Sequence, residues 1–456
     1  MRSLLGLIVL LFAAAAAALS TTGNRLLAIL DNVDDKALYS QFFGDLKARG
    51  FDVDYETPRT DGLKLSHLGE RIYDHIIFFP TKVKGLGPNL TPSLLLDFVK
   101  AGGNILVAMS STMSASTSVT NMLSELEISL PPERTGTVVD HFNYDTVSAA
   151  EAHDVLVLDA PVSTRPGLKN LFEMPDAVIA MPRVAGHVLG QSQLLTPVLR
   201  APATAYSYNP KEQPSSVEAD ELFAAGSQLA LVSTVQVRNS ARVTVLGSAE
   251  MLQDSWMDGV KVARLGGAKV KPENREFAKR LTGWTFQEIG VLRVNSVEHR
   301  LQGQNETNPG IYRVKTDVAY TISLSEHSWD KWVPFAVPEE DSLQLEFSML
   351  SPFHRLDLAS TLVTETATIF SKNFTLPDQH GIFNFKVNYK RPFLTYIEDK
   401  QTVSVRHMAH DEWPRSYVIS GAWPWLSGIA TTVVGFVGFS ALWMYSKPTG
   451  KVAKKA

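Results

Sequence analysis

Three aspartates near the start of the chain have the spacing of a possible acidic site. Asp31, Asp34 and Asp35 follow the apolar run of residues 25–30. Ligands of open α/β sheets bind outside the carboxyl ends of the strands, so these carboxylates could hold a cation or act as general acid and base. An aspartate at this position can also cap the following helix. We favour capping by Asp34 or Asp35, because the spacing places no histidine or further carboxylate set beside them.

A serine-rich loop after residues 104–108 is the second place where catalysis could occur. In α/β domains of the amidotransferase type, the nucleophile lies on the loop after such a strand. The chain has no cysteine, which excludes a thiol nucleophile and leaves Ser110 or Ser111. The G-x-S-x-G pattern of a serine nucleophile elbow is absent, so we interpret this loop as non-catalytic.

The other candidate motifs are weaker. Residues 84–87 (KGLG) share glycines with a phosphate loop but lack its G-x-x-x-x-G-K-[ST] pattern. His407 and His410 are three residues apart at the end of a predicted strand, and we interpret them as surface histidines. The sequence therefore predicts no catalytic, cofactor-binding or metal-binding residues.

The composition excludes several classes of protein. Of 456 residues, 45% are hydrophobic and 20% are charged, which is typical of globular proteins and excludes disorder as the main state. The net charge of −4 argues against a nucleic-acid-binding protein. Without cysteine, the chain has no disulfides, cysteine-ligated zinc or iron–sulfur clusters.

Alternating strands and helices predict an α/β domain over residues 21–286. Its short connections favour a doubly wound parallel sheet of the amidotransferase or flavodoxin-like kind, covered on both faces. Residues 131–214 are rich in turn signals, and we expect them to be an insertion or the far edge of the sheet. The predicted strands are 25–30, 51–55, 75–79, 104–108, 229–237 and 242–246, and the predicted helices are 34–50, 91–102, 119–126 and 273–284.

Residues 287–415 have the pattern of a second, all-β domain. Alternating or β-branched runs recur at regular spacing with turn residues between them, which predicts a sandwich-like fold. These runs are residues 312–324, 342–349, 366–370, 382–389 and 402–407.

The two ends of the chain predict a membrane topology. Residues 1–20 contain one arginine, an apolar run and small residues before residue 21, the pattern of a cleaved signal peptide. Residues 423–445 are uncharged, long enough for a transmembrane helix, and flanked by tryptophan and tyrosine. The lysine-rich residues 446–456 are predicted to be cytosolic. We therefore expect a single-pass type I membrane protein with most of the chain in the lumen.

Small residues follow one side of the predicted transmembrane helix. Ser427, Thr431 and Gly435 are spaced four apart, and Gly421, Gly428 and Gly435 are spaced seven apart. Small residues let another helix approach closely, so we predict a helix-packing face here.

Three sequons make Asn89, Asn305 and Asn373 candidates for N-glycosylation. Each lies near turn residues, and the predicted lumen is the right compartment. Pro92, just after the first sequon, should lower the use of Asn89.

Beyond these patterns, several stretches resemble the 48-kilodalton, Wbp-type subunit family of the oligosaccharyltransferase complex. The longest is LPDQHGIFNFKVNYKR at residues 376–391, followed by VSVRH at 403–407 and HDEWPR at 410–415. The match runs in order from about residue 24 to the predicted membrane span. Shorter matching stretches are AILDN (28–32), GSAEM (247–251), WTFQE (284–288) and YRVKTD (312–317).

This resemblance implies an endoplasmic-reticulum complex that transfers a lipid-linked oligosaccharide to asparagine in N-x-S/T sequons. In that family this subunit is not catalytic, and its amidotransferase-like domain lacks the nucleophile. The implied partners are the catalytic multi-spanning subunit, the ribophorin-type subunits and the small DAD-type subunit. One departure is that Lys454 and Lys455 are out of register for a di-lysine retrieval signal.

Two alternatives come from the α/β pattern and from the two-domain layout of the predicted luminal part. The first is an independent luminal hydrolase-like enzyme, which would need a nucleophile such as Ser110 or Ser111. The second is a luminal module that binds glycan or peptide.

Overall fold

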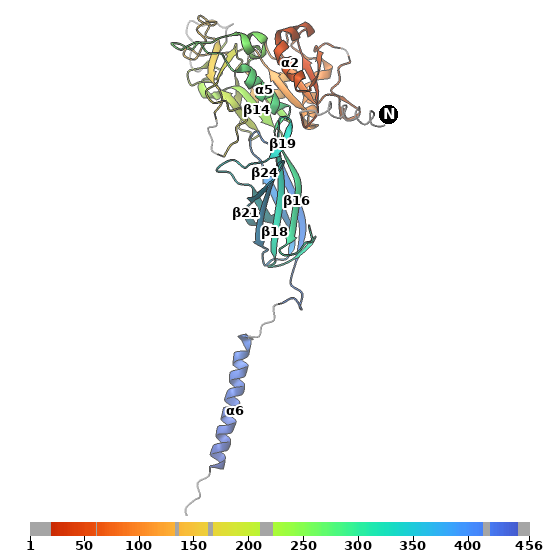
Figure 1. The fold of residues 1–456 in the computed structure, drawn as a ribbon, viewed down its shortest axis with the longest axis vertical. Coiled ribbons are helices and arrows are strands. Elements are labelled where there is room, and N and C mark those ends of the chain that lie inside the picture. The colour runs from red at the N-terminus through yellow and green to blue at the C-terminus, as the bar shows by residue number, and fades with distance from the viewer. Residues whose placement is uncertain are drawn as a thin grey trace, which may run out of the picture.

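The computed structural model describes residues 20–60, 62–132, 136–162, 167–209, 222–413 and 420–445. Figure 1 shows an α/β region, a strand-rich region after it, and the terminal helix α6. The predicted signal peptide, apart from Ser20, and the predicted cytosolic tail with Lys454 and Lys455 lie outside the described residues.

A nine-stranded mixed sheet forms the centre of the α/β region. Its strands are β1 (Arg25–Ile29), β2 (Asp52–Glu56), β5 (His75–Phe78), β6 (Asn104–Ala108), β7 (Ile128–Ser129), β11 (His187–Leu189), β12 (Leu195–Arg200), β14 (Leu229–Gln236) and β15 (Arg242–Leu246). They lie in the order β2-β1-β5-β6-β15-β14-β11-β7, and β12 pairs with β14.

Only part of this sheet is parallel, which corrects the expectation of a parallel sheet throughout. β2, β1, β5, β6 and β15 run parallel to one another. β14 runs antiparallel to β15, β11 and β12, and β7 runs antiparallel to β11. The physical reason at β14 and β15 is that residues 237–241 are too few for the crossover that parallel neighbours need.

Helices cover both faces of the sheet. α2 (Ser40–Ala48) and α5 (Asn274–Thr285) pack on the face that holds Leu26 and Ala28 of β1. α3 (Pro92–Lys100) and α4 (Thr117–Glu125) pack on the opposite face, with Leu27 and Ile29. Alternate residues of one strand point to opposite faces, and because both faces are covered the strand is apolar throughout.

Short elements complete the α/β region. β8 (Thr137–Val139) pairs with β13 (Tyr206–Tyr208), β9 (Val155–Asp159) pairs with β10 (Val178–Pro182), and β3 (Ser66–His67) pairs with β4 (Glu70–Arg71). The predicted helix at 34–50 is divided into the 3-10 helix η1 (Val33–Tyr39) and α2. The other 3-10 segments are η2 (Pro88–Leu90), η4 (Gly226–Gln228) and η5 (Glu250–Leu252), and η6 (Ser255–Gly259) is a π turn.

Two five-stranded sheets form the second region, which confirms that it is rich in strands. The first sheet contains β16 (Ile289–Leu301), β18 (Asp317–Ser328), β19 (Lys331–Pro334), β22 (Ala359–Val363) and β23 (Thr368–Thr375). The second contains β17 (Ile311–Arg313), β20 (Gln344–Ser348), β21 (Pro352–Asp357), β24 (Gly381–Tyr389) and β25 (Ile397–Arg406). Both sheets contribute to one buried cluster, for example through Tyr320 and Phe385.

Hydrogen bonds join the two regions at the start of β16 and at the loop between β24 and β25. Trp284 Nε1 donates to Phe393 O at 2.8 Å, and Gln236 Nε2 donates to Leu394 O at 2.6 Å. Gly290 has φ 68°, and a Cβ at this position would lie 2.5 Å from Phe393 O. Only glycine fits this close approach without strain.

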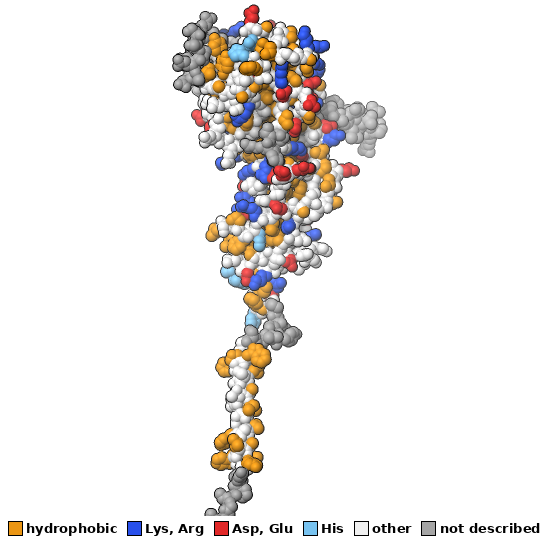
Figure 2. Space-filling model, turned by 90° about the vertical axis from the view of Figure 1, so that its left-hand side faces the viewer, with side chains coloured by type: hydrophobic (Ala, Val, Ile, Leu, Met, Phe, Trp, Pro, Cys, Tyr) orange, Lys and Arg blue, Asp and Glu red, His pale blue; other side chains and the backbone are white. Residues whose placement is uncertain are grey.

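Helix α6 (Trp423–Met444) follows η7 (Ser420–Ala422) and stands apart from the two regions in Figure 1. It has 22 residues, and an 18-residue window within it has a mean hydropathy of 1.6, so it is long and apolar enough to cross a membrane. Figure 2 shows hydrophobic side chains along it and no charged ones on the visible face. The helix ends one residue before the predicted span does.

Candidate functional site

The three aspartates do not form one acidic site. Asp31 Oδ1 accepts a hydrogen bond from the Lys82 backbone N–H at 2.8 Å, and its Oδ2 lies 3.8 Å from Lys82 Nζ. Asp35 Oδ2 accepts from the Asn32 N–H at 3.1 Å, at the beginning of η1. Asp34 is exposed. The capping interpretation is therefore confirmed for Asp35, while Asp31 fixes the loop after β5.

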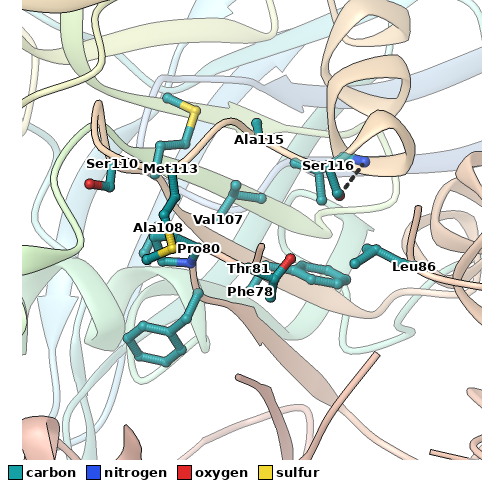
Figure 3. Close-up of a pocket in the computed structure, with 13 residues that line it drawn as sticks. Phe78, Pro80, Thr81, Leu86, Val107, Ala108, Ser110, Met113, Ala115 and Ser116 are labelled. Carbon is teal, nitrogen blue, oxygen red and sulfur yellow. Dashed lines mark hydrogen bonds between the residues drawn. The ribbon is translucent and has the colours of Figure 1, made fainter. Parts of the chain in front are cut away.

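The serine-rich loop lies at the carboxyl ends of β5 and β6 and closes a small apolar pocket (Figure 3). Phe78, Val107 and Leu86 line this pocket together with Met113. Its volume is about 20 Å³, which is roughly the room that one water molecule needs. A pocket of this size and polarity cannot hold a substrate.

Neither serine of this loop has the neighbours of a nucleophile. Ser110 is 3% exposed, and its Oγ lies 2.8 Å from Thr112 Oγ1. Ser111 is 6% exposed, and its N–H donates to Arg183 O at 3.1 Å. Among the residues that the structure describes, no histidine or carboxylate forms a hydrogen bond with either hydroxyl. A serine without a base is a weak nucleophile, so this geometry agrees with a non-catalytic loop.

The charged groups beside this loop are paired with each other. Arg183 Nε donates to Glu250 Oε2 at 2.7 Å, and Arg183 Nη2 also contacts this carboxylate. The carboxylate of Glu250 is thus engaged by Arg183, and among the described residues it forms no hydrogen bond with Ser110 or Ser111. Within the described part of the chain, no group of three or more His, Asp or Glu could hold a metal ion.

The two weaker motifs also lie in ordinary surroundings. In the KGLG segment, Lys84 O accepts from the Thr117 N–H at 2.8 Å, and Leu86 fills the apolar pocket. His407 and His410 are exposed after the end of β25, as predicted. The ring of His407 lies against that of His380, with centroids 4.0 Å apart.

Fully buried charged side chains lie at the junction of the two regions, and the sequence analysis missed them. Arg242 of β15 is 0% exposed and donates to three backbone carbonyls. Arg49 Nη1 donates to Glu288 Oε2 at 2.5 Å, and the Glu288 side chain is 0% exposed. The sequence did contain a signal for this buried charge. Arg242 begins the otherwise apolar strand RVTVL, and a buried arginine requires dedicated hydrogen-bond partners.

The three sequon asparagines have different surroundings. Asn305 is exposed in the loop after β16, and Asn373 is exposed on β23. Asn89 is half-buried in η2. Their glycosylation stays a prediction.

On α6, the hydroxyls of the predicted packing face bond to the helix itself. Ser427 Oγ donates to Pro424 O at 2.9 Å, and Thr431 Oγ1 donates to Ser427 O at 2.7 Å. These bonds give both hydroxyls an acceptor within the helix, as polar groups in a lipid environment require. A Cβ at Gly435 would meet no atom within 4 Å. Contact of this face with another helix stays a prediction.

Taken together, the described residues form a two-region protein with one apolar terminal helix and no assembled active site. The OST48 N-terminal domain family matches residues 17–288, and the OST48 middle domain family matches residues 299–447. This chain therefore belongs to the family of 48 kDa subunits of dolichyl-diphosphooligosaccharide–protein glycosyltransferase.

Three relatives match nearly the whole chain. The 48 kDa subunit of Arabidopsis thaliana is 30% identical, over 93% of this chain and 94% of the relative. The subunit wbp1 of Schizosaccharomyces pombe is 32% identical, over 95% and 94%. The 48 kDa subunit of Danio rerio is 32% identical, over 94% and 93%. The structural match to a solved putative ThuA-like protein of Parabacteroides merdae covers 57% of this chain and 89% of that protein, with a TM-score of 0.28 and 13% identity.

Proposed function

We propose that this chain is an accessory, non-catalytic subunit of an oligosaccharyltransferase complex, which transfers a lipid-linked oligosaccharide to asparagine in N-x-S/T sequons. The family match supports membership of the complex. The observation that supports an accessory role is the loop after β6, where Ser110 has no base beside it among the described residues. The chain would then contribute to assembly and stability of the complex.

We infer a doubly wound, flavodoxin-like domain over residues 21–286 and a sandwich-like domain over 287–415. The parallel strands β2-β1-β5-β6-β15 support the first inference, because they follow the 2-1-3-4-5 order when counted among themselves. The hydrophobic cluster shared by two five-stranded sheets supports the second.

We further propose that the protein is a single-pass type I protein of the endoplasmic-reticulum membrane. Residues 1–20 would be the signal peptide, the two regions would lie in the lumen, and residues 446–456 would be cytosolic. The length and composition of α6 support a single span. The partners would be the catalytic multi-spanning subunit, the ribophorin-type subunits and the small DAD-type subunit.

Purification through a C-terminal tag tests the subunit role directly. The chain should be isolated in mild detergent and its partners identified by mass spectrometry. Recovery of the catalytic subunit in near-equal amount is the expected result. Recovery of the tagged chain without any transferase subunit would contradict the proposal.

Replacing Gly435 with leucine should weaken assembly of the complex without disturbing the luminal regions. A Cβ at this position meets no atom within 4 Å, so we expect the effect to come from a neighbouring helix. Because small residues permit close helix approach, we expect recovery of partner subunits to fall several-fold. Quantitative mass spectrometry after purification measures this recovery.

Val433→Leu is the matched control, because residue 433 lies on nearly the opposite side of the helix from residue 435. It should recover partners as the wild type does. Equal recovery from Gly435→Leu and wild type would refute the packing face.

Replacing Ser110 with alanine tests the alternative of a hydrolase-like enzyme. Without a base at this hydroxyl, we expect glycosylation of a reporter protein to change by less than about twofold, whereas loss of a true nucleophile costs orders of magnitude. Ser116→Ala is the control from the same loop. It removes the cap at the N–H of Val119 and should lower stability by about 1 kcal/mol, also without loss of activity. Complete loss of activity in Ser110→Ala with normal assembly would support the enzyme.

A further inference from the structure

Most of the exposed large apolar side chains of the strand-rich region lie at one end of it. β16 and β25 both begin beside the α/β region, and we call the opposite end, where both strands finish, the distal end (Figure 1). Residues 289–413 expose seven large apolar side chains. Five of them belong to the distal end or to the chain just after it, namely Ile311, Leu350, Phe353, Ile382 and Trp413, and the other two, Leu362 and Val363, lie on β22. Apolar surface that gathers in this way marks an interaction site.

Two of these side chains lie side by side on the outer face of the second sheet. Ile311 of β17 and Ile382 of β24 are both paired with Ser404 of β25, so the three side chains point to the same face. Val403 and Val405, the neighbours of Ser404 along β25, are buried and point to the opposite face. The two isoleucines therefore flank one small polar residue on the solvent side of the sheet.

The turn between β20 and β21 extends this apolar surface. Leu350 in this turn is 98% exposed. A Cβ at Gly381 would lie 2.7 Å from Met349 Sδ, so the turn packs directly against the start of β24. The Phe353 ring contacts the buried ring of Phe383, with centroids 5.3 Å apart, which anchors the surface to the core. We call Ile311, Leu350, Phe353 and Ile382 the distal patch.

The chain that leaves the distal end leads into the apolar helix α6. Arg406 Nη1 and Nη2 donate to the two carboxylate oxygens of Glu412, both at 2.7 Å, which holds residues 409–412 against the end of β25. Ten residues, 413–422, then separate Glu412 from the first residue of α6. A fully extended chain of this length spans about 35 Å at most. The distal end therefore stays close to the surface of any membrane that α6 crosses.

The residues around the distal patch have the character of a membrane interface. Trp413 is exposed on the chain between the patch and α6, and tryptophan prefers the headgroup level of a membrane. Charged groups at the distal end are paired with each other: Lys315 Nζ lies 2.6 Å from Asp378 Oδ2, and Arg406 is paired with Glu412. These pairs carry no net charge, so we expect apolar contact to dominate over attraction to anionic lipids.

The edge of the second sheet is poorly suited to pairing with a strand of another protein. β21 is the edge strand, and it begins with Pro352, which has no N–H to donate. Its pairing with β20 shifts register at Phe353, which interrupts the ladder that an added strand would extend. Leu350 also protrudes from a turn instead of lining a groove, which suits insertion among lipid headgroups.

The two exposed sequon asparagines of the strand-rich region belong to the other sheet. Asn305 lies in the loop after β16, and Asn373 lies on β23, and both of these strands are part of the first sheet. The distal patch belongs to the second sheet and its turn. Membrane contact through the second sheet therefore leaves both asparagines room for a glycan in water.

We propose that the distal patch rests on the membrane, with Leu350 and Ile382 inserted among the headgroups of zwitterionic lipid. The proposal rests on the proposed function in one respect, namely that α6 spans that membrane. It gives the chain a second, peripheral membrane contact. This contact fixes the height and tilt of the strand-rich region, which the connection to α6 alone leaves open.

Site-specific fluorescent labels test this contact in the full-length chain. The chain has no cysteine, so single cysteines can be introduced without removing native ones. Leu350→Cys and Ile382→Cys should each be labelled with an environment-sensitive fluorophore and reconstituted in phosphatidylcholine vesicles. Leu265→Cys is the control, because Leu265 lies in the α/β region and is 61% exposed, against 63% for Ile382. Lipids with a nitroxide near the headgroup should quench the labels at residues 350 and 382 several-fold more than the label at residue 265.

A label on Val434→Cys, within α6, distinguishes failure of the patch from failure of the membrane span. Lipids with a nitroxide deep in the acyl chain should quench it. If residue 434 lies in lipid while the labels at residues 350 and 382 are quenched no more than that at residue 265, the patch proposal is wrong and the span stands. If residue 434 does not lie in lipid, both proposals are wrong.

Leu350→Asp, with the label kept at residue 382, tests whether the apolar side chain makes the contact. Quenching at residue 382 should fall several-fold, because a carboxylate is costly to remove from water. Leu362→Asp, on β22, is the matched control and should leave quenching unchanged. Unchanged quenching in Leu350→Asp would overturn the proposal. So would quenching that requires anionic lipid, or protection of residue 350 that appears only when other subunits are bound, since a protein would then cover the patch.

Discussion

Arg242→Ala is expected to lower the free energy of unfolding by about 4 kcal/mol, the largest effect predicted for a single residue. The guanidinium donates to Trp284 O at 2.6 Å, Ile289 O at 2.8 Å and Gly290 O at 2.7 Å. It also lies 4.7 Å from the centre of the Trp284 ring. Burial lowers the pKa of Arg242 to about 9, so its charge is retained at neutral pH. Alanine would leave three buried carbonyls without donors and create a cavity.

Chemical unfolding of the purified chain, followed by tryptophan fluorescence, measures this loss. Arg300→Ala is the control, because Arg300 is exposed on β16. It should change stability by less than about 0.5 kcal/mol. If Arg242→Ala unfolded at the same denaturant concentration as the control, the assigned role of Arg242 would be wrong.

The second large effect concerns the buried pair of Arg49 and Glu288 and depends on pH. Desolvation raises the pKa of Glu288 to about 7, against the opposing effect of the positive charges of Arg49 and Lys279. The folded state therefore holds the proton more tightly than the unfolded state, whose pKa is near 4.5. The resulting stabilisation is fully present below pH 4.5 and is lost as the pH rises through about 7.

Glu288→Gln removes this titration, so the stability of wild type relative to the variant should fall between about pH 5 and 7. The expected slope is on the order of 1 kcal/mol per pH unit. His327 Nδ1 lies 2.9 Å from Glu288 O, and burial lowers the pKa of this histidine. Its contribution has the opposite sign and is present in both proteins, so it cancels in the difference.

Unfolding curves at pH 5, 6, 7 and 8 for both proteins give the difference directly. Glu365→Gln, at an exposed loop position, is the control and should follow the wild type at each pH. A constant difference between wild type and Glu288→Gln over this range would show that Glu288 does not titrate there. Arg49→Ala should lower the free energy of unfolding most above pH 7, where it leaves the buried carboxylate of Glu288 without its compensating positive charge.

Strands and helices that are determined by residues close by in the sequence could be predicted from local patterns. Strands β1, β5 and β6 are buried on both faces, so a continuous apolar run identifies each of them without knowledge of the neighbouring strands. Thr91 before Pro92 correctly marked the beginning of α3, because a cap and an N1 proline act within one turn. Residue types alone exclude a thiol nucleophile, because the chain has no cysteine.

Features that depend on distant residues were not predictable in this way. The antiparallel placement of β14 beside β15 is an exception, because its cause is local: the predicted strands 229–237 and 242–246 leave too few residues between them for a parallel crossover. The carbonyl partners of Arg242 come from α5 and β16, which follow it by more than 40 residues in the sequence. Periodicity reports which face of an element is buried but not what covers it.

The hydrogen bond from Trp284 to Phe393 also has a consequence for the order of events during synthesis. The two residues are separated by 109 positions, and the contact from Gln236 to Leu394 spans 158. At the usual rate of translation, roughly 5 to 20 seconds pass between the emergence of Trp284 and that of Phe393. If the α/β region folds within this interval, the indole N–H of Trp284 and the amide of Gln236 lack their acceptors on the later loop. A nascent chain of this protein therefore presents an unfinished polar surface for seconds, at which a chaperone can engage it before the second region folds.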